Sequence, residues 1–489
     1  MPVSQDLAET SAIGTAAARE IRELPGPGGW PLVGNMLQFD LPRLHLQFER
    51  WADVHGSPYR LRFGRRDILV IADADPIAAV LRDRPDTWRR LRPIESVIRE
   101  MGGHGVFSAE GEDWKRQRRL VMGAFDPAHL RRFFPSLVRV TERLAARFRE
   151  AARSGEALDL QATLMRYTVD VTAGLAFGAD VNTLQAPHDP LQAHLDKLFP
   201  MLFRRINLPW PYWRYLRLPG DRAFDRHLAE VHTAIRGFIN AARQRLHGDS
   251  GLREHPTNLL EAMLAVRDAD GDALSEEEIA GNVLTVLLAG EDTTANTLAW
   301  ALHLLHAHPP VWRELVAEVD AVLGEDELPQ RFEVARGFDF LEACVQETMR
   351  LRPVAPLLFF EANRDTTLAG CRIPAGAGLF CLMRKAATSG ELGADTADFR
   401  PARWPGPASD GAAQGRVLHK ASMPFGAGPR MCPGRYLALL EMKMVLATLA
   451  RNFDLLEVAT PGGEPPEERI AFTMFPVGLR LRLAERRRH

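Results

Sequence analysis

The sequence predicts a mainly α fold with a small β region, and three observations lead to that prediction. From about residue 74 to residue 350 the chain shows helical periods broken by short Pro- and Gly-containing segments. Strand-like runs are short and lie on either side of this region. The 489 residues are 46% hydrophobic and 25% charged, which suits a large core and excludes a disordered chain. We expect a polar leader over residues 1–24 and a single domain over residues 25–489.

The first elements follow a turn-rich boundary of Pro and Gly at residues 25–35. Residues 59–63 and 68–71 are rich in β-branched and aromatic side chains, and the short Gly-containing segment between them predicts a β-hairpin. Helices are then expected up to residue 350. The leader itself has acids where a signal peptide needs a basic start and an apolar core.

The longest predicted helix begins at Ser275, which forms a capping box with Glu278, and runs to about His306. At roughly 30 residues it would be about 45 Å long, enough to cross the molecule. Its apolar run stops at the segment from Gly290 to Thr294, where a Gly, two acids and two hydroxyls interrupt a buried helix. Buried polar groups need partners, so this interruption is a place where function is expected.

The last part of the chain is expected to be mixed. Residues 366–373 and 378–383 have strand character, and residues 433–452 predict a final helix. Residues 388–431 between them show no clear helix or strand period. Loops of this length inside a folded domain are usually functional or disordered.

Charge and cysteine content exclude several classes of protein. A formal net charge of -2 gives no global attraction to nucleic acid or to anionic membranes. The four cysteines include no CxxC pair, which argues against a disulfide framework or a zinc ribbon and favours a reducing compartment. Apolar runs fall short of the roughly 20 residues needed to span a bilayer. We therefore expect a cytoplasmic protein without a membrane anchor.

Residues 425–434, Phe-Gly-Ala-Gly-Pro-Arg-Met-Cys-Pro-Gly, hold the strongest candidate for chemistry. Glycines such as Gly426 and Gly434 let the backbone pass close to a flat ligand, and Arg430 suits a carboxylate. Cys432 precedes a helix, whose free N–H groups and dipole favour the thiolate. The alternative is a buried structural thiol without reactivity.

This stretch resembles the haem-binding loop FxxGxRxCxG of the cytochromes P450, with Phe425 at its first position. The resemblance extends from Pro25 nearly to the C-terminus. It implies the fold of that family, with a long central helix over haem b and Cys432 as the axial ligand of the iron.

The segment from Glu347 to Arg350 is similar to the family's ExxR motif, and Phe399 to Trp404 is similar to its PERF segment. The resemblance implies a buried triad of Glu347, Arg350 and Arg403 beneath the haem. An exposed helical pair at i,i+3 is the alternative for the first two.

Trp114 and Arg118 match the family's WxxxR motif and share one helix face, which implies contact with the haem propionates together with Arg430. The alternative is an ordinary half-buried Trp beside a solvated basic face. Glu361 stands where many bacterial members have an Arg toward a propionate, so that contact is in doubt.

The segment from Ala289 to Thr294 is similar to the family's oxygen-activation motif. There the resemblance implies that Asp292 exchanges protons with solvent and that the Thr293 hydroxyl holds water or oxygen. Gly290 would leave room for the oxygen. Thr293 could instead donate a hydrogen bond to its own helix, a common arrangement for buried Thr.

By the same resemblance the substrate pocket is lined by apolar side chains, so we expect an apolar small molecule. The expected lining is Ala289, Val354, Ala355, Met474, Phe475 and the loop before Trp114. Residues 209–218, aromatic and basic, are either a mobile entrance or a simple surface loop.

The resemblance also implies electrons from NAD(P)H through a separate ferredoxin or flavodoxin and its reductase. We expect a basic docking face for this acidic partner, steered by charge and weakened by salt. The residues of that face are Lys115, Arg116, Arg118, Arg119, Lys420 and Arg430.

Taken together, the sequence predicts a monomeric haem-thiolate monooxygenase that uses O2 to hydroxylate or epoxidise its substrate. Oxidative C–C or C–O coupling on the same iron is an alternative. A haem-binding sensor without turnover is another, against which Asp292 and Thr293 argue.

Overall fold

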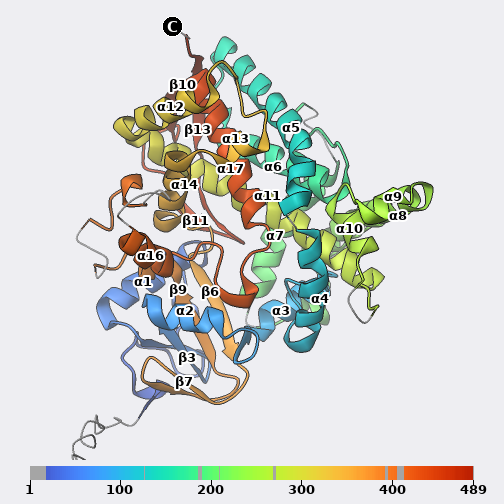
Figure 1. Cartoon of the computed structure of the whole chain (residues 1–489). Helices are drawn as coiled ribbons and strands as arrows, with labels where there is room; N and C mark the ends of the chain where they lie inside the picture. Colours follow the sequence, from blue (N-terminus) through green and yellow to red (C-terminus); the bar gives the residue numbers. More distant parts are fainter. Residues whose placement is uncertain are drawn as a thin grey trace, which may run out of the picture.

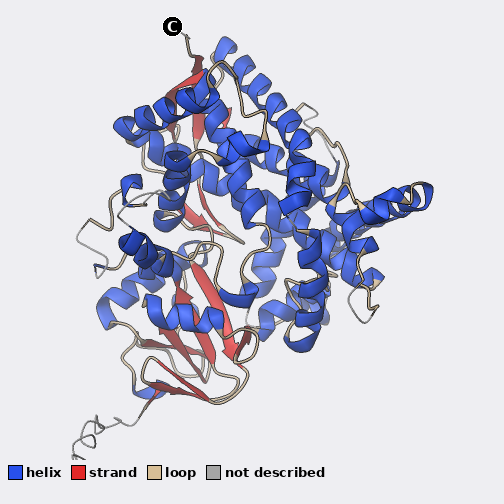
Figure 2. Ribbon diagram, viewed as in Figure 1, coloured by secondary structure: helices blue, strands red, loops and turns tan. Residues whose placement is uncertain are grey.

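The computed structural model describes residues 18–125, 127–185, 190–208, 210–267, 271–390, 395–404 and 412–487. Helices dominate, and four small sheets accompany them (Figures 1 and 2), so the predicted fold class is confirmed. No helix of these residues is long and apolar enough to cross a membrane.

The helices of the described residues are α1 Leu44–His55, α2 Ala74–Arg82, α3 Arg92–Glu100, α4 Gly111–Ala124, α5 Pro127–Ser154, α6 Leu160–Phe177, α7 Pro190–Asn207, α8 Pro219–Gly248, α9 Gly251–Glu254, α10 Leu259–Ala265, α11 Glu276–Ala307, α12 Pro309–Leu323, α13 Phe332–Arg336, α14 Asp339–Leu351, α15 Met383–Ala387, α16 Ala412–Ala421 and α17 Arg435–Asn452. The strands are β1 Arg19–Glu20, β2 Tyr59–Phe63, β3 Arg66–Ile71, β4 Trp88–Arg90, β5 Leu158–Asp159, β6 Leu357–Ala362, β7 Thr366–Leu368, β8 Cys371–Ile373, β9 Gly378–Leu382, β10 Phe453–Ala459, β11 Glu468–Ile470, β12 Met474–Pro476 and β13 Arg480–Glu485.

The largest sheet has the strand order β2-β3-β9-β6-β4 and lies with α1 and α2 at the lower left of Figure 1. The predicted hairpin is its first pair, in which Tyr59 lies opposite Val70 in antiparallel register. Strands β9 and β6 come from the part of the chain beyond residue 350, so this sheet joins the two ends of the sequence.

Helix α11 runs through the centre of the molecule (Figure 1). The predicted capping box is present, because Ser275 N–H donates to Glu278 Oε2 at 2.7 Å and Glu278 N–H donates to Ser275 Oγ at 3.2 Å. Its 32 residues give a length of roughly 48 Å at 1.5 Å per residue. The long central helix expected from the sequence is therefore confirmed.

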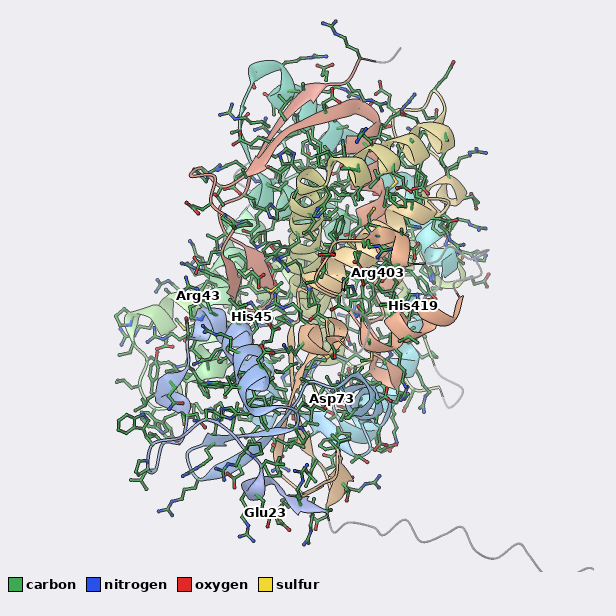
Figure 3. All side chains as sticks on the ribbon, turned by 90° about the vertical axis from the view of Figure 1, so that its left-hand side faces the viewer. Glu23, Arg43, His45, Asp73, Arg403 and His419 are labelled. Carbon is green, nitrogen blue, oxygen red and sulfur yellow. The ribbon has the colours of Figure 1, made fainter. Side chains whose placement is uncertain are left out.

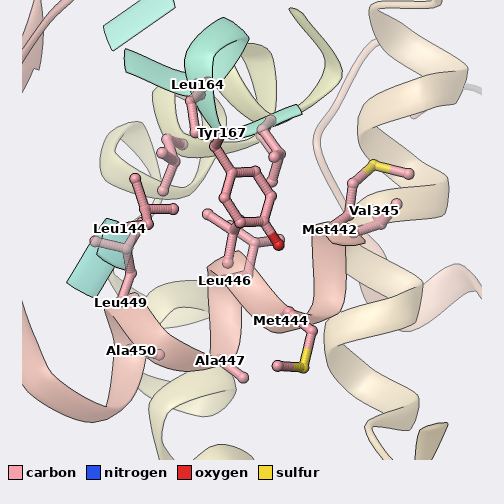
Figure 4. Close-up of a cluster of buried hydrophobic side chains, with 14 of the residues drawn as sticks. Leu144, Leu164, Tyr167, Val345, Met442, Met444, Leu446, Ala447, Leu449 and Ala450 are labelled. Atoms are coloured by element: carbon pink, nitrogen blue, oxygen red, sulfur yellow. The ribbon is translucent and has the colours of Figure 1, made fainter. Parts of the chain in front are cut away.

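Helix α17 is buried on nearly all sides, which agrees with its low content of charged residues after the first turn. Leu446 and Leu449 of α17 pack with Leu144 of α5 and with Leu164 and Tyr167 of α6 (Figure 4). This core holds the C-terminal half of α17 against α5 and α6.

The structure corrects the description of residues 388–431 as lacking regular structure. The described residues of this stretch include α16 and the short 3₁₀ turns Pro401–Arg403 and Gly428–Arg430. The sequence does not predict α16, because its ten residues, AAQGRVLHKA, include only two large apolar residues and so show no helical period.

Candidate functional site

The loop that carries Cys432 closes on itself immediately before α17. The N–H of Cys432 donates to the carbonyl oxygen of Phe425 at 2.9 Å. Gly426 and Gly428 have φ of +72° and +67°, values that favour glycine. At Gly428 a Cβ atom would lie 2.6 Å from Arg82 Cα, so this glycine allows close approach to α2. Gly434 has an ordinary φ of -80° and is the N-cap residue of α17.

The Cys432 residue is half-buried, and the partial desolvation of its thiol raises the pKa. The backbone N–H of Gly434 and the charges of Arg118 and Arg435 act in the opposite direction. The helix start therefore acts in the direction expected from the sequence, and desolvation opposes it. A positive charge against the sulfur would further favour the anion.

The carboxylate of Glu110 lies among three arginines, Arg84, Arg90 and Arg430. Arg430 Nη2 donates to Glu110 Oε2 at 2.6 Å, and the backbone N–H of Arg90 donates to Glu110 Oε1 at 3.0 Å. The guanidinium of Arg90 donates to the carbonyl oxygen of Phe107 at 3.1 Å. Arg84 Nη2 lies 3.8 Å from Glu110 Oε1. Burial lowers the pKa of all three side chains, that of Arg430 to about 10.

Several guanidinium N–H groups of this cluster do not donate a hydrogen bond to any described residue. The Nε atoms of Arg84, Arg90 and Arg430, and Nη2 of Arg84, have no hydrogen-bond partner among the described residues. Buried donors and charges without partners are costly, so the cluster suits an anion with several acceptor oxygens. Arg84 and Arg90 were not predicted from the sequence, and no local motif marks them.

The two residues of the WxxxR motif both reach the Cys432 loop. The Trp114 ring is buried, and Cζ of the Arg430 guanidinium lies 4.5 Å from the centroid of this ring. Arg118 Nη2 donates to the carbonyl oxygen of Met431 at 2.6 Å. Arg118 therefore holds the backbone of Met431, the residue before Cys432.

Glu347 lies at the centre of a buried hydrogen-bond network. Its carboxylate accepts two bonds of 2.8 Å from Arg350 and one of 2.8 Å from Arg403. The indole N–H of Trp404 and the backbone N–H of Arg400 complete the set, at 2.8 and 3.0 Å. Glu347 and Arg350 are 0% and 1% exposed, which excludes the alternative of a surface pair.

The polar interruption of α11 is held by neighbouring elements. Asp292 accepts hydrogen bonds from Asn296 Nδ2 at 2.7 Å and from the hydroxyl of Thr473. Burial raises the pKa of Asp292, and these two donors lower it. The Thr293 hydroxyl donates to the carbonyl oxygen of Ala289 at 2.7 Å, which is the alternative considered from the sequence.

Gly290 lies at the contact between α11 and α6. A Cβ atom on it would lie 2.6 Å from Thr172 Oγ1, so this glycine allows α6 to pack closely on α11. The neighbouring Thr168 hydroxyl donates to the carbonyl oxygen of Glu291 at 2.8 Å. The space on the Cβ side of Gly290 is therefore filled by α6, and its expected role in leaving room for oxygen stays a prediction.

An apolar cavity lies next to this part of α11. Its lining is Ile98, Met101, Gly103, Phe107, Leu202, Leu284, Thr285, Leu288, Ala289 and Phe472. Of the five positions predicted for a substrate pocket, Ala289 is in this lining, and Val354, Ala355, Met474 and Phe475 are not. Met474 is fully buried, and its sulfur accepts a hydrogen bond from Arg384. Phe472, two residues before Met474, lies in the cavity lining instead.

Glu361 is directed away from the Arg430 cluster. Its Oε1 lies 3.0 Å from Nε of Arg92, and its side chain is buried.

Arg430 does not belong to the expected basic docking face, because its side chain is only 6% exposed and faces Glu110. Lys115 is paired with Asp86 and Glu112.

Residues 210–218 are tied to α3, and Pro209 lies outside the described residues. The indole N–H of Trp213 donates to Glu100 Oε2 at 2.8 Å, and Arg214 Nε donates to Glu100 Oε1 at 2.6 Å. Ile98 of α3 and Leu202 of α7 both line the cavity, so this segment connects two of its walls.

Comparisons with known proteins agree with this arrangement. The family model described as cytochrome P450 matches residues 24–482. Pentalenene oxygenase of Streptomyces avermitilis is 28% identical, over 94% of this chain and 97% of its own length. Thromboxane-A synthase of Rattus norvegicus is 28% identical, over 90% of this chain and 88% of its own. The crystal structure of the cytochrome P450DA heme domain superposes with a TM-score of 0.84 at 24% identity, covering 96% of this chain and 99% of that one. The chain therefore belongs to the cytochrome P450 family.

Proposed function

We propose that this P450 inserts one oxygen atom from O2 into an apolar small molecule, by hydroxylation or epoxidation, with haem b as its cofactor. Electrons come from NAD(P)H through a separate ferredoxin or flavodoxin and its reductase. The observation that carries the proposal is the pairing of a half-buried thiol, Cys432, with a cluster of arginines in which several buried guanidinium N–H groups have no acceptor among the described residues.

The residues of the site fit a haem. Cys432 would be the ligand, with the backbone of Gly434 donating toward its sulfur. Arg84, Arg90 and Arg430 would receive the propionates, whose oxygens supply the acceptors that their free N–H groups need. When bound, a thiolate-ligated haem supplies the activation and cleavage of dioxygen.

The cavity selects for an apolar substrate. Its walls are aliphatic and aromatic, and Thr285 is the one hydroxyl in the lining. That hydroxyl donates to the carbonyl oxygen of Gly281 at 2.7 Å, so it offers a substrate no free hydrogen. These walls also exclude water from the face of α11 that carries Ala289.

Asp292 and Thr293 supply the proton chemistry. Burial makes Asp292 a weaker acid than usual, which suits a group that takes up and releases protons during turnover. The Thr293 hydroxyl gives its hydrogen to Ala289, so its oxygen is left to accept a hydrogen bond from water or from a protonated group.

The test uses holoenzyme reconstituted with a surrogate ferredoxin and reductase. A library of apolar compounds is first screened for a low-to-high spin shift, and the ligands found are then incubated with NADPH and ¹⁸O₂. One ¹⁸O atom per product molecule is expected. Products that lack ¹⁸O and are formed by coupling or desaturation would overturn the proposal.

A further inference from the structure

Asp292 is held by a closed set of three hydrogen bonds. Asn296 Nδ2 donates to Asp292 Oδ1 at 2.7 Å and to Thr473 Oγ1 at 3.0 Å. The Thr473 hydroxyl in turn donates to Asp292 Oδ2. Both amide hydrogens of Asn296 and the single hydroxyl hydrogen of Thr473 are used in this way.

The orientation of the Asn296 amide is determined by a fourth residue. Gln161 of α6 donates from Nε2 to Asn296 Oδ1 at 2.7 Å. Because that oxygen faces Gln161, the Nδ2 group must face Asp292 and Thr473. Asn296 is 0% exposed, so solvent does not offer alternative partners.

Thr473 comes from a distant part of the chain. It lies in the turn between β11 and β12, where the N–H of Ala471 donates to the carbonyl oxygen of Thr473 at 3.0 Å. Its neighbour Phe472 lines the cavity, and its ring centroid lies 6.4 Å from that of Phe107. One tight turn therefore contributes a cavity wall and a donor to Asp292.

We propose that Thr473 and Asn296 are positioning residues that hold the Asp292 carboxylate in one orientation, one helical turn from Ala289. This proposal rests on the proposed role of Asp292 in proton transfer. The two bonds occupy one acceptor site on each carboxylate oxygen and leave the others for water and protons. With the carboxylate fixed, these remaining sites face a constant direction during turnover.

The first test is isotope-edited infrared spectroscopy of the resting holoenzyme labelled with ¹³C-Asp, in which Asp292→Asn identifies the carboxyl band. In Thr473→Val, loss of one donor to the carboxylate should shift the titration of that band upward by about one pH unit. Thr473→Ser keeps the hydroxyl and should titrate as the wild type. Thr448→Val removes a buried hydroxyl that donates within α17, at 2.6 Å to Met444, and is the matched control.

Asn296→Leu tests the second donor, and the same upward shift is expected. A wild-type titration in both Thr473→Val and Asn296→Leu would overturn the proposal. The second readout is the fraction of electrons lost to hydrogen peroxide during NADPH oxidation, which should rise several-fold in Thr473→Val and not in Thr473→Ser. If Asp292→Asn itself leaves that fraction unchanged, the proposed function of Asp292 fails, whereas the infrared result judges the positioning role by itself.

Discussion

Replacing Glu347 by Ala tests the buried charge network most sharply. The carboxylate accepts five hydrogen bonds, from Arg350, Arg403, Trp404 and the backbone of Arg400. Glu347→Ala leaves the guanidinium of Arg350, whose side chain is 1% exposed, without its counter-ion, and leaves Arg403, 5% exposed, with only its pair to Asp395 at 3.4 Å. Breaking a buried pair in this way costs about 3 to 5 kcal/mol.

That loss is a large part of the roughly 5 to 15 kcal/mol by which a folded domain is stable. We therefore expect Glu347→Ala either to remain unfolded or to fold without retaining haem. The assay is urea unfolding followed by far-UV circular dichroism, together with the haem content per mole of purified protein.

Glu333→Ala is the control, because Glu333 is 68% exposed in its pair with Arg131. It should change the unfolding free energy by less than about 1 kcal/mol. The reasoning would be refuted by Glu347→Ala protein that unfolds like this control and carries a full complement of haem.

Three further predictions follow from other contacts. Gly428→Ala should lower the melting temperature and the haem content, since its Cβ would lie 2.6 Å from a backbone atom of α2 at a φ of +67°; unchanged values would contradict the proposed close approach. Gly290→Ala should destabilise the packing of α6 on α11, and the double variant with Thr172→Ala should recover stability in thermal unfolding; no recovery would show that Thr172 is not the obstacle. Desolvation raises the pKa of the half-buried Glu468, but the hydrogen bond from His45 and the charge of Arg384 outweigh it and lower this pKa to about 2. Glu468 stabilises the fold above its usual pKa, and this contribution is lost as pH falls toward 2, so Glu468→Gln should show a flatter decline of unfolding free energy between pH 5 and 2; an equally steep decline would count against it. Figure 3 shows His45 beside Arg43.

Local patterns in the sequence predicted the elements that depend on local physics. The capping box at Ser275 and Glu278 defines the start of α11, and the alternation of apolar residues defines the β2–β3 hairpin. A short motif also brought Glu347 and Arg350 together, because residues three apart share one helix face.

Contacts between distant segments could not be predicted in the same way. Arg430 pairs with Glu110, 320 positions away in the chain, so the burial of its side chain could not be predicted from the local sequence. Arg84 and Arg90 resemble ordinary surface arginines until the fold buries them around Glu110. Phe472 and Thr473 lie in a short turn without a recognisable pattern, and only the packing of that turn on α11 gives them a role.

The most direct test of the whole account is the absorbance spectrum of the purified protein, reduced and bound to CO. The wild type should show the signature of a thiolate ligand, Cys432→Ser should lose it, and Cys371→Ser, which alters a buried thiol outside the loop, should keep it. A protein that stays colourless after incubation with hemin, or a Cys432→Ser variant with the wild-type Soret band, would contradict the account.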